Sequence, residues 1–183
     1  MTMLRPGVQL TPGGQPRPAA GSWRVDPARS YVSFAARAAG RMVQGRLPLT
    51  GRVLIAEPIG DSVAWLAARA GQVSTGSHLL DRQLAGPGFL DAGAFPEISF
   101  RSELLAWVPT GWRAVGRLRV KGTEHELACQ LDLDHDGEPL GDPPRIRITG
   151  RWILDSRWIT RHWIPGLGRC IPMTCSFLLE PSM

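Results

Sequence analysis

The sequence predicts an all-β fold of about eight antiparallel strands. Apolar and polar residues alternate with a period of two through most of the chain, whereas no long segment keeps a helical period. Short turns such as Lys121-Gly122-Thr123 and Pro109-Thr110-Gly111 separate these alternating segments. Each segment has one apolar face, which must be covered either by closing the sheet on itself or by packing it on another layer. A closed barrel and a two-sheet sandwich both satisfy this pattern.

The first half of the chain contains three of the expected strands. The first begins at Tyr31, the second lies near Gly45–Ile55, and the third follows Asp61. Their apolar faces comprise Val32, Phe34 and Ala36 on the first strand, and Ala64, Leu66, Ala68 and Ala70 on the third. Residues that alternate in this way lie on one face of a strand.

The alternation is clearest in the second half of the chain, where five further strands are expected. Their apolar faces comprise Ile98, Phe100 and Leu104; Trp112, Ala114, Gly116, Leu118 and Val120; Leu127, Cys129, Leu131 and Leu133; Ile146, Ile148, Trp152 and Leu154; and Ile171, Met173, Cys175, Phe177 and Leu179. Arginine and acidic residues occupy the intervening positions. We therefore expect one dry face and one solvated face along each strand.

Length and composition favour one domain preceded by a leader. The 183 residues suffice for a sizeable core, and no stretch approaches the roughly 18 apolar residues of a membrane helix, so a soluble protein is expected. Residues 1–21 are rich in proline and glycine, which predicts a disordered leader before a β domain at residues 22–181. The leader lacks an apolar signal-peptide core, which favours a cytoplasmic location.

Charge and cysteine content narrow the possible partners. The net charge of +5 comes almost entirely from arginine, and most arginines fall on outward strand positions opposite acids such as Glu124, Glu126 and Asp132. This arrangement predicts a solvated, cross-paired surface rather than a nucleic-acid interface, while an anionic membrane surface stays open as a partner. Three cysteines cannot form a closed disulfide set, so buried free thiols are expected.

Several motifs in order resemble one known family. The segment Ser74–Phe100 reads STGSHLLDRQLAGPGFLDAGAFPEISF, the chain opens with Trp23-Arg24-Val25-Asp26-Pro27, and Gly116–Gly122 reads GRLRVKG. Over roughly residues 22–180 this order is similar to the YceI-like family of lipocalin-like lipid-binding proteins. The resemblance implies an eight-stranded antiparallel lipocalin-like barrel, with one or two short helices in the loop around residues 77–93.

Two departures separate this chain from the family pattern. Ala38 stands where the family commonly has a histidine, and Asp155–Ile159 only loosely matches a late family motif. The segment from Trp152 to Trp163 instead holds three of the seven tryptophans. We infer that the fold transfers to this chain, whereas the identity of the ligand need not.

The resemblance implies that a long apolar lipid is bound inside the barrel. Such a lipid would be a polyisoprenoid, an isoprenoid quinone or a fatty-acyl compound, and the protein would act as its carrier, buffer or storage protein. Small residues on the inward face would leave room for it, although alternation of small and large residues can also simply fit the taper of a barrel. The candidate ligand-binding residues are Phe34, Ala36, Leu66, Ala68, Phe89, Phe100, Leu104, Ala114, Gly116, Leu118, Leu131, Ile148, Trp152 and Phe177.

A helix at residues 77–84 and a turn at residues 87–95 are expected to cover one mouth of the barrel. Ser77 is a candidate N-cap, and Leu79, Leu80 and Leu84 would turn inward. The candidates to meet a polar head group at the rim are His78, Asp81 and Arg82. The alternative for each of these three is an ordinary exposed helix residue.

No motif in the chain indicates catalysis, and no cofactor or metal site is expected. The nucleophile-elbow, zinc-protease and phosphate-loop patterns are absent, and the four histidines have no ligand spacing. A hydrolase of lipid esters stays an alternative, as does binding of haem or another planar ligand by His162 beside Trp158 and Trp163. Family barrels are often dimers, so a homodimer also stays open.

Overall fold

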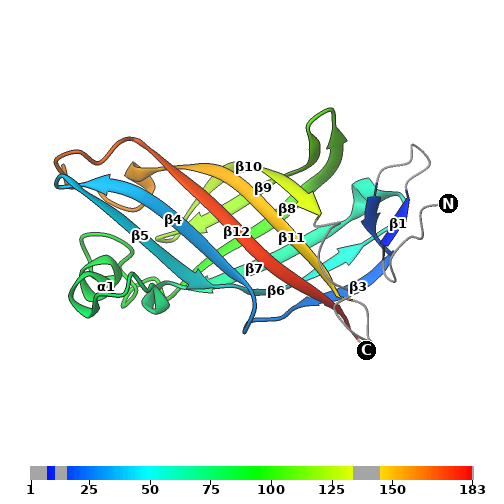
Figure 1. Cartoon of the computed structure of the whole chain (residues 1–183), viewed down its shortest axis with the longest axis horizontal. Helices are drawn as coiled ribbons and strands as arrows, with labels where there is room; N and C mark the ends of the chain where they lie inside the picture. The colour runs from blue at the N-terminus through cyan, green and yellow to red at the C-terminus, as the bar shows by residue number, and fades with distance from the viewer. Residues whose placement is uncertain (1–7, 11–15, 134–144, 183) are drawn as a thin grey trace.

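Ten strand segments form one antiparallel sheet in the computed structural model, which describes residues 8–10, 16–133 and 145–182 (Figure 1). The segments are β3 (Gly21–Val25), β4 (Tyr31–Ala38), β5 (Arg41–Pro48), β6 (Thr50–Ile55), β7 (Val63–Arg69), β8 (Glu97–Val108), β9 (Gly111–Val120), β10 (Thr123–Leu133), β11 (Ile146–Asp155) and β12 (Cys170–Pro181). The helical elements are α1 (His78–Ala85) and three 3-10 turns, η1 (Ile59–Asp61), η2 (Ala70–Gln72) and η3 (Ser156–Trp158).

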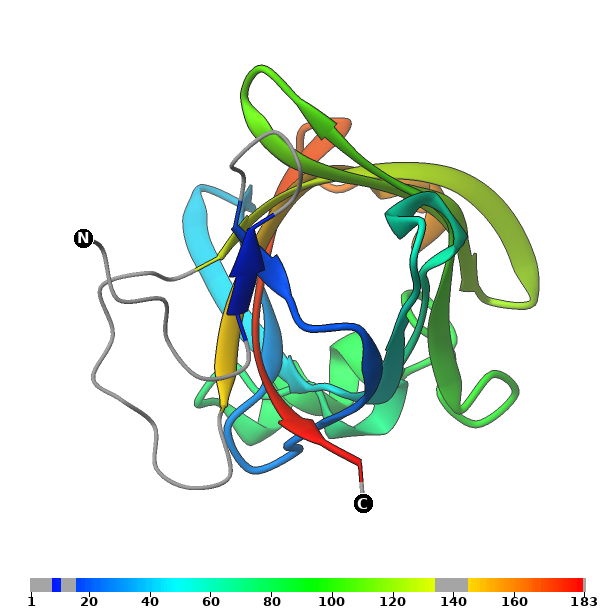
Figure 2. The ribbon, with the colours of Figure 1, turned by 90° about the vertical axis from the view of Figure 1, so that its right-hand side faces the viewer.

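These ten segments make a closed barrel of eight strands. β3 and β4 pair one after the other along the same strand, β12, and β5 and β6 are separated only by Leu49, so each couple acts as one broken strand. Pairing of β11 with β12 completes the ring, which Figure 2 shows from one end. The predicted eight-stranded antiparallel barrel with a short helix in the loop after residue 77 is confirmed.

The two ends of the barrel carry different elements (Figure 1). At the helix end lie α1, the β4–β5 turn, and the connection between β11 and β12, residues 156–169, which we call the β11–β12 loop. At the hairpin end lie the C-terminus and a small hairpin of β1 (Val8–Leu10) and β2 (Pro16–Pro18). Among the described residues, no helix combines the length and apolarity needed to span a bilayer.

The β1–β2 hairpin differs from the disordered leader that composition predicts for residues 1–21. Pro18 is buried, Ala19 packs against the core, and the carbonyl oxygen of Ala19 accepts a hydrogen bond of 2.9 Å from Trp23 Nε1. These contacts hold Pro18 and Ala19, near the end of the predicted leader, against the barrel. The rest of that prediction falls on residues outside the described part of the chain.

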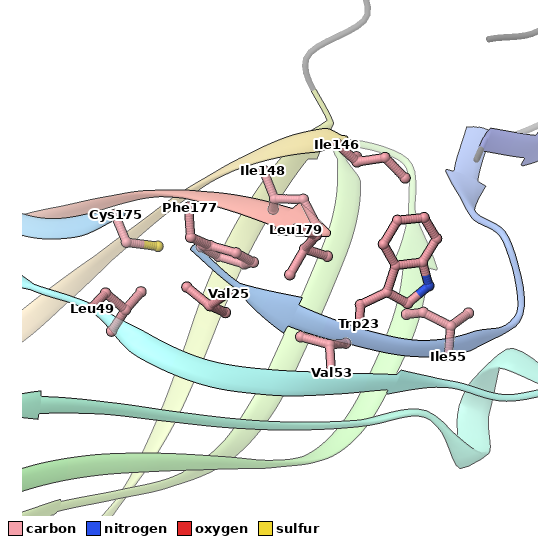
Figure 3. Packing of buried hydrophobic residues seen from close by; sticks show 10 residues of the cluster. All are labelled: Trp23, Val25, Leu49, Val53, Ile55, Ile146, Ile148, Cys175, Phe177 and Leu179. Carbon is pink, nitrogen blue, oxygen red and sulfur yellow. The ribbon is translucent and has the colours of Figure 1, made fainter. Parts of the chain in front are cut away.

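A hydrophobic core closes the hairpin end of the barrel (Figure 3). It consists of Trp23, Val25, Leu49, Val53, Ile55, Ile146, Ile148, Cys175, Phe177 and Leu179. These side chains come from β3, β6, β11 and β12 and from the break at Leu49, and Figure 3 shows them gathered between the strands. Because this cluster leaves little space at the hairpin end, any large cavity must lie nearer the helix end.

A β-bulge in β8 changes the expected position of Leu104. The register against β9 shifts between Ser102 and Leu104, so that Leu104 lies opposite Val115 and Leu105 lies opposite Ala114. A bulge inserts one residue and reverses the alternation beyond it. Leu104 is therefore 47% exposed, and its predicted inward position is wrong.

Candidate functional site

The barrel interior holds a cavity of about 1130 Å³ that extends toward the helix end. Aliphatic and aromatic side chains from the barrel strands, α1 and the β11–β12 loop make up most of its wall. Among the described residues that line it, Arg41, Arg82 and His162 are the basic ones, and no aspartate or glutamate takes part. Within the described part of the chain, the site is thus an apolar chamber lined by basic but not by acidic side chains.

Most of the predicted ligand-binding residues lie on the cavity wall. Those that line it are Phe34, Ala36, Leu66, Ala68, Phe89, Phe100, Ala114, Leu118, Leu131, Trp152 and Phe177. Leu104 does not, because of the bulge, and Ile148 is buried in the core that closes the hairpin end. That the lining residues bind a ligand stays a prediction.

Gly116 faces inward without widening the cavity. A Cβ atom at this position would overlap the carbonyl oxygen of Arg101 and lie 2.7 Å from the Cα of Ser102. The glycine therefore lets the bulged backbone of β8 approach β9, and it does not line the chamber. The room predicted for Gly116 is supplied instead by Ala64 and Ala114, which lie on the wall.

Two buried thiols share one patch of the wall. Cys129 on β10 and Cys175 on β12 approach each other above Gly150 on β11, where a Cβ would lie 2.9 Å and 2.7 Å from their respective sulfur atoms. A hydrogen bond to Cys175, together with burial, raises the pKa of the Cys129 thiol far above its usual range. Because the thiolate is the nucleophile of cysteine chemistry, Cys129 contributes an apolar surface rather than a reactive group.

The segment before and within α1 forms a lid at the cavity opening. The carboxylate of Asp81 accepts hydrogen bonds from the backbone N–H of Thr75 at 2.7 Å and from Thr75 Oγ1 at 2.6 Å. This contact ties the turn to the helix. Ser77 occupies the expected N-cap position, but its side chain makes no capping hydrogen bond. Leu80 and Leu84 face the chamber, and Leu79 borders its opening with 72% of its surface exposed.

Of the three predicted rim residues, Arg82 alone lines the cavity. His78 is exposed and lies outside the wall, and Asp81 is engaged with the turn. A head-group role is therefore best supported for Arg82. Arg41 at the β4–β5 turn and His162 in the β11–β12 loop join it at the wall, and neither was among the expected rim residues.

The β11–β12 loop supplies part of the wall that sequence reasoning did not assign. Ile159, His162, Ile164 and Leu167 line the chamber. Asp155 anchors the loop, because its carboxylate accepts hydrogen bonds from Arg157 and Arg169, and these contacts, Arg157 first, hold the pKa of that carboxyl well below its usual range. The tryptophan-rich departure from the family pattern was the signal that could have pointed to this loop.

The geometry does not assemble the alternative sites. Among the described residues, no histidine side chain has a serine or carboxylate within hydrogen-bond reach, and no group of three potential metal ligands is present. His135 lies outside the described residues. Trp158 stacks on His125 with ring centroids 4.2 Å apart, and Trp163 is 85% exposed, an arrangement that does not favour the alternative of a planar-ligand site around His162.

The outer face of the barrel carries cross-strand ion pairs. Arg117 pairs with Glu103 at 3.3 Å, and Arg151 pairs with Asp132 at 2.6 Å. Such exposed pairs are typical of a solvated sheet surface. Arg117 and Arg151 thus have acidic partners on neighbouring strands.

Comparisons with known proteins found a matching family model and solved structures of similar fold. A family model described as YceI-like domain matches residues 23–155. Burkholderia cenocepacia BcnA is 16% identical with a TM-score of 0.72, and the match covers 84% of this chain and 98% of BcnA. A polyisoprenoid binding domain from Saccharophagus degradans is 12% identical with a TM-score of 0.59, covering 87% of this chain and 98% of that one. A Campylobacter jejuni YceI protein is 14% identical with a TM-score of 0.62, covering 76% and 86%. No curated protein matches the chain.

Proposed function

This chain belongs to the YceI-like domain family, and from that membership and the cavity we propose that it binds one long apolar lipid inside its barrel. The observation that carries the proposal is the chamber of about 1130 Å³ with its largely apolar wall. This volume lies slightly above the range of ordinary small-molecule pockets, which span about 300–1,000 Å³. A polyisoprenoid, an isoprenoid quinone or a fatty-acyl compound fits such a chamber, and the Saccharophagus degradans domain of the same fold is a polyisoprenoid binding domain.

Transfer energetics favour reversible exchange of this lipid. Moving a chain from water into the chamber is favourable by about 0.8 kcal/mol for each CH₂ group. Moving it from a bilayer gains almost nothing, because lipid tails are as apolar as the wall. The protein therefore loads and unloads at membranes with little barrier from burial itself, which suits a carrier, buffer or storage protein.

The polar end of the ligand meets a basic rim. Arg41, Arg82 and His162 line the cavity, and no acidic residue of the described chain opposes them there. Guanidinium groups bind phosphate and carboxylate with two parallel hydrogen bonds. We extend the proposal to a ligand whose head group is anionic, such as a prenyl phosphate or a fatty carboxylate.

A comparison of head groups tests this part of the proposal. We expect Arg41→Gln combined with Arg82→Gln to weaken binding of a prenyl phosphate about tenfold, because each lost charge-assisted contact is exposed and partly screened. Binding of the prenyl alcohol with the same chain should hardly change. The measurement is a titration followed by tryptophan fluorescence, with Arg113→Gln on the outer face as the matched control.

The two possible failures of this titration are distinguishable. Equal weakening for the phosphate and the alcohol would contradict recognition of the head group but leave the apolar site intact. If the wild-type protein binds neither compound, the lipid-binding function itself is wrong.

We propose binding rather than catalysis, because the family is one of binding proteins and the site offers an apolar wall instead of an ordered nucleophile and base. The cytoplasmic location and the homodimer stay predictions.

A further inference from the structure

The most exposed large apolar side chains of the described residues gather at one end of the barrel. They are Trp163, Leu79 and Met42, with 85%, 72% and 58% of their surfaces exposed. Each comes from a different segment at the helix end: the β11–β12 loop, α1 and the start of β5 just after the β4–β5 turn (Figure 1). These are also the segments that border the cavity opening.

Direct contacts hold the three segments together. The backbone N–H of Ala39 in the β4–β5 turn donates a hydrogen bond of 2.6 Å to the carbonyl oxygen of Pro165 in the β11–β12 loop. The ring of His162 in the same loop lies beside Gly88, just after α1, where a Cβ would be 3.5 Å from its Cδ2 atom. The exposed apolar side chains are therefore presented by one connected rim.

Positive charge accompanies these apolar groups. Arg41, Arg82 and Arg161 are exposed on the same segments, Arg37 is exposed near the end of β4, and none of the four makes an ion pair with another described residue. Some outward strand arginines, Arg117 and Arg151 among them, do pair with acids.

The acidic residues at this end do little to offset that charge. Asp155 is shared by Arg157 and Arg169, and Asp81 is hydrogen-bonded to Thr75. Asp91 is half-buried in the turn after α1, and Glu97 and Glu124 lie at the starts of β8 and β10 rather than on the elements that carry the four arginines. The rim is therefore both apolar and basic.

We propose that this rim, formed by Met42, Leu79, Trp163, Arg37, Arg41, Arg82 and Arg161, docks on an anionic phospholipid bilayer with the cavity opening toward the membrane. Exposed apolar side chains surrounded by basic ones match the boundary between acyl chains and phosphate groups. Tryptophan is enriched at that depth, and arginine near an anionic leaflet is attracted to it. The proposal rests on the proposed lipid-binding function, and it adds the place where the lipid enters.

Because the hairpin end of the barrel is closed, the helix end is the one that faces the membrane. The buried cluster around Trp23 and Leu179 seals that end, so a chain enters and leaves at the helix end. With the rim on the bilayer, an isoprenoid or acyl chain passes from the acyl region to the apolar wall without crossing bulk water. Docking and exchange therefore use the same surface.

Vesicle flotation tests the docking surface. We expect the wild-type protein to float with vesicles of 70% phosphatidylcholine and 30% phosphatidylglycerol, and much less with phosphatidylcholine alone. Trp163→Ser combined with Arg161→Glu should lower the bound fraction at least about tenfold, because it removes an interfacial aromatic ring and reverses one charge. The control combines Ile153→Ser with Arg113→Glu, which makes the same kind of change on the outer wall, where Ile153 is 55% exposed.

A second assay separates docking from lipid binding. Trp163 and Arg161 do not line the cavity, so their variant should bind a prenyl phosphate added from solvent as the wild type does, yet extract it from vesicles more slowly. If wild-type protein binds the lipid in solution but floats with neither kind of vesicle, the docking proposal is wrong and the proposed function stands. Wild-type protein that floats with the anionic vesicles but binds no lipid in solution would contradict the proposed function and leave the docking surface standing. Equal flotation with neutral vesicles, unaffected by the variant, would also overturn the proposal, because neither the charge nor this rim would then mediate contact.

Discussion

A variant with Ala64→Phe and Ala114→Phe is expected to lose uptake of long isoprenoid chains while its barrel still forms. Both alanines line the cavity, and Ala64 packs against the cluster that closes the hairpin end. Two phenyl rings at these positions would fill part of the chamber and shorten it. Losing room for about four CH₂ groups costs roughly 3 kcal/mol, which corresponds to about a hundredfold weaker binding.

The measurement is the binding isotherm for prenyl compounds of increasing chain length. The loss should grow with chain length, because short chains need not reach the filled region. Ile153→Phe, which adds a ring on the exposed outer face of β11, is the matched control and should bind as the wild type does. A cooperative thermal transition in both variants shows that the fold is kept. Unchanged affinity for the longest chain in the folded double variant would mean that the lipid does not occupy this chamber.

Gly116→Ala is expected to destabilise the barrel by about 3 kcal/mol, a large effect for the addition of one methyl group. The new Cβ would overlap the carbonyl oxygen of Arg101 and crowd the Cα of Ser102, both backbone atoms of β8. Backbone cannot rotate away as the end of a flexible side chain can. The β8–β9 pairing must therefore separate around the bulge.

Urea denaturation gives the free energy of unfolding for this variant. Gly93→Ala is the matched control, because a Cβ there has no atom within 4 Å and the residue does not have a positive φ. We expect Gly93→Ala to change stability by less than about 0.5 kcal/mol. Near-equal unfolding midpoints for the two variants would contradict the close approach of β8 to β9.

The strands were predictable because each has a solvated face and an apolar face. That alternation places Phe34, Leu66 and Phe100 on the inner wall, where the structure has them. Closure into a barrel did not follow from alternation, since a sandwich has the same pattern. It came from the family resemblance, and the pairing of β11 with β12 confirms it.

The errors arose where the backbone departs from regular alternation. The bulge between Ser102 and Leu104 adds one residue, and a period of two cannot reveal which strand carries the extra residue. A glycine on an inward face can either leave space in a cavity or allow a neighbouring backbone to approach. Gly116 was interpreted as leaving space, whereas it allows the backbone of β8 to approach.

The β11–β12 loop was missed for another reason. Its wall residues, among them His162 and Leu167, follow no regular period, and they reach the cavity only because Asp155 and the β4–β5 turn hold the loop in place. Long-range contacts of this kind leave no local pattern in a sequence. The unusual density of tryptophan was the one available sign that this region has a role of its own.

Native mass spectrometry of the freshly purified protein, followed by organic extraction, tests lipid binding without a choice of ligand beforehand. We expect a population heavier than the bare chain by the mass of one prenyl or fatty-acyl compound, and the same compound in the extract. A bare mass that stays unchanged after incubation with prenyl phosphate, prenyl quinone and fatty acid would contradict lipid binding by the chamber.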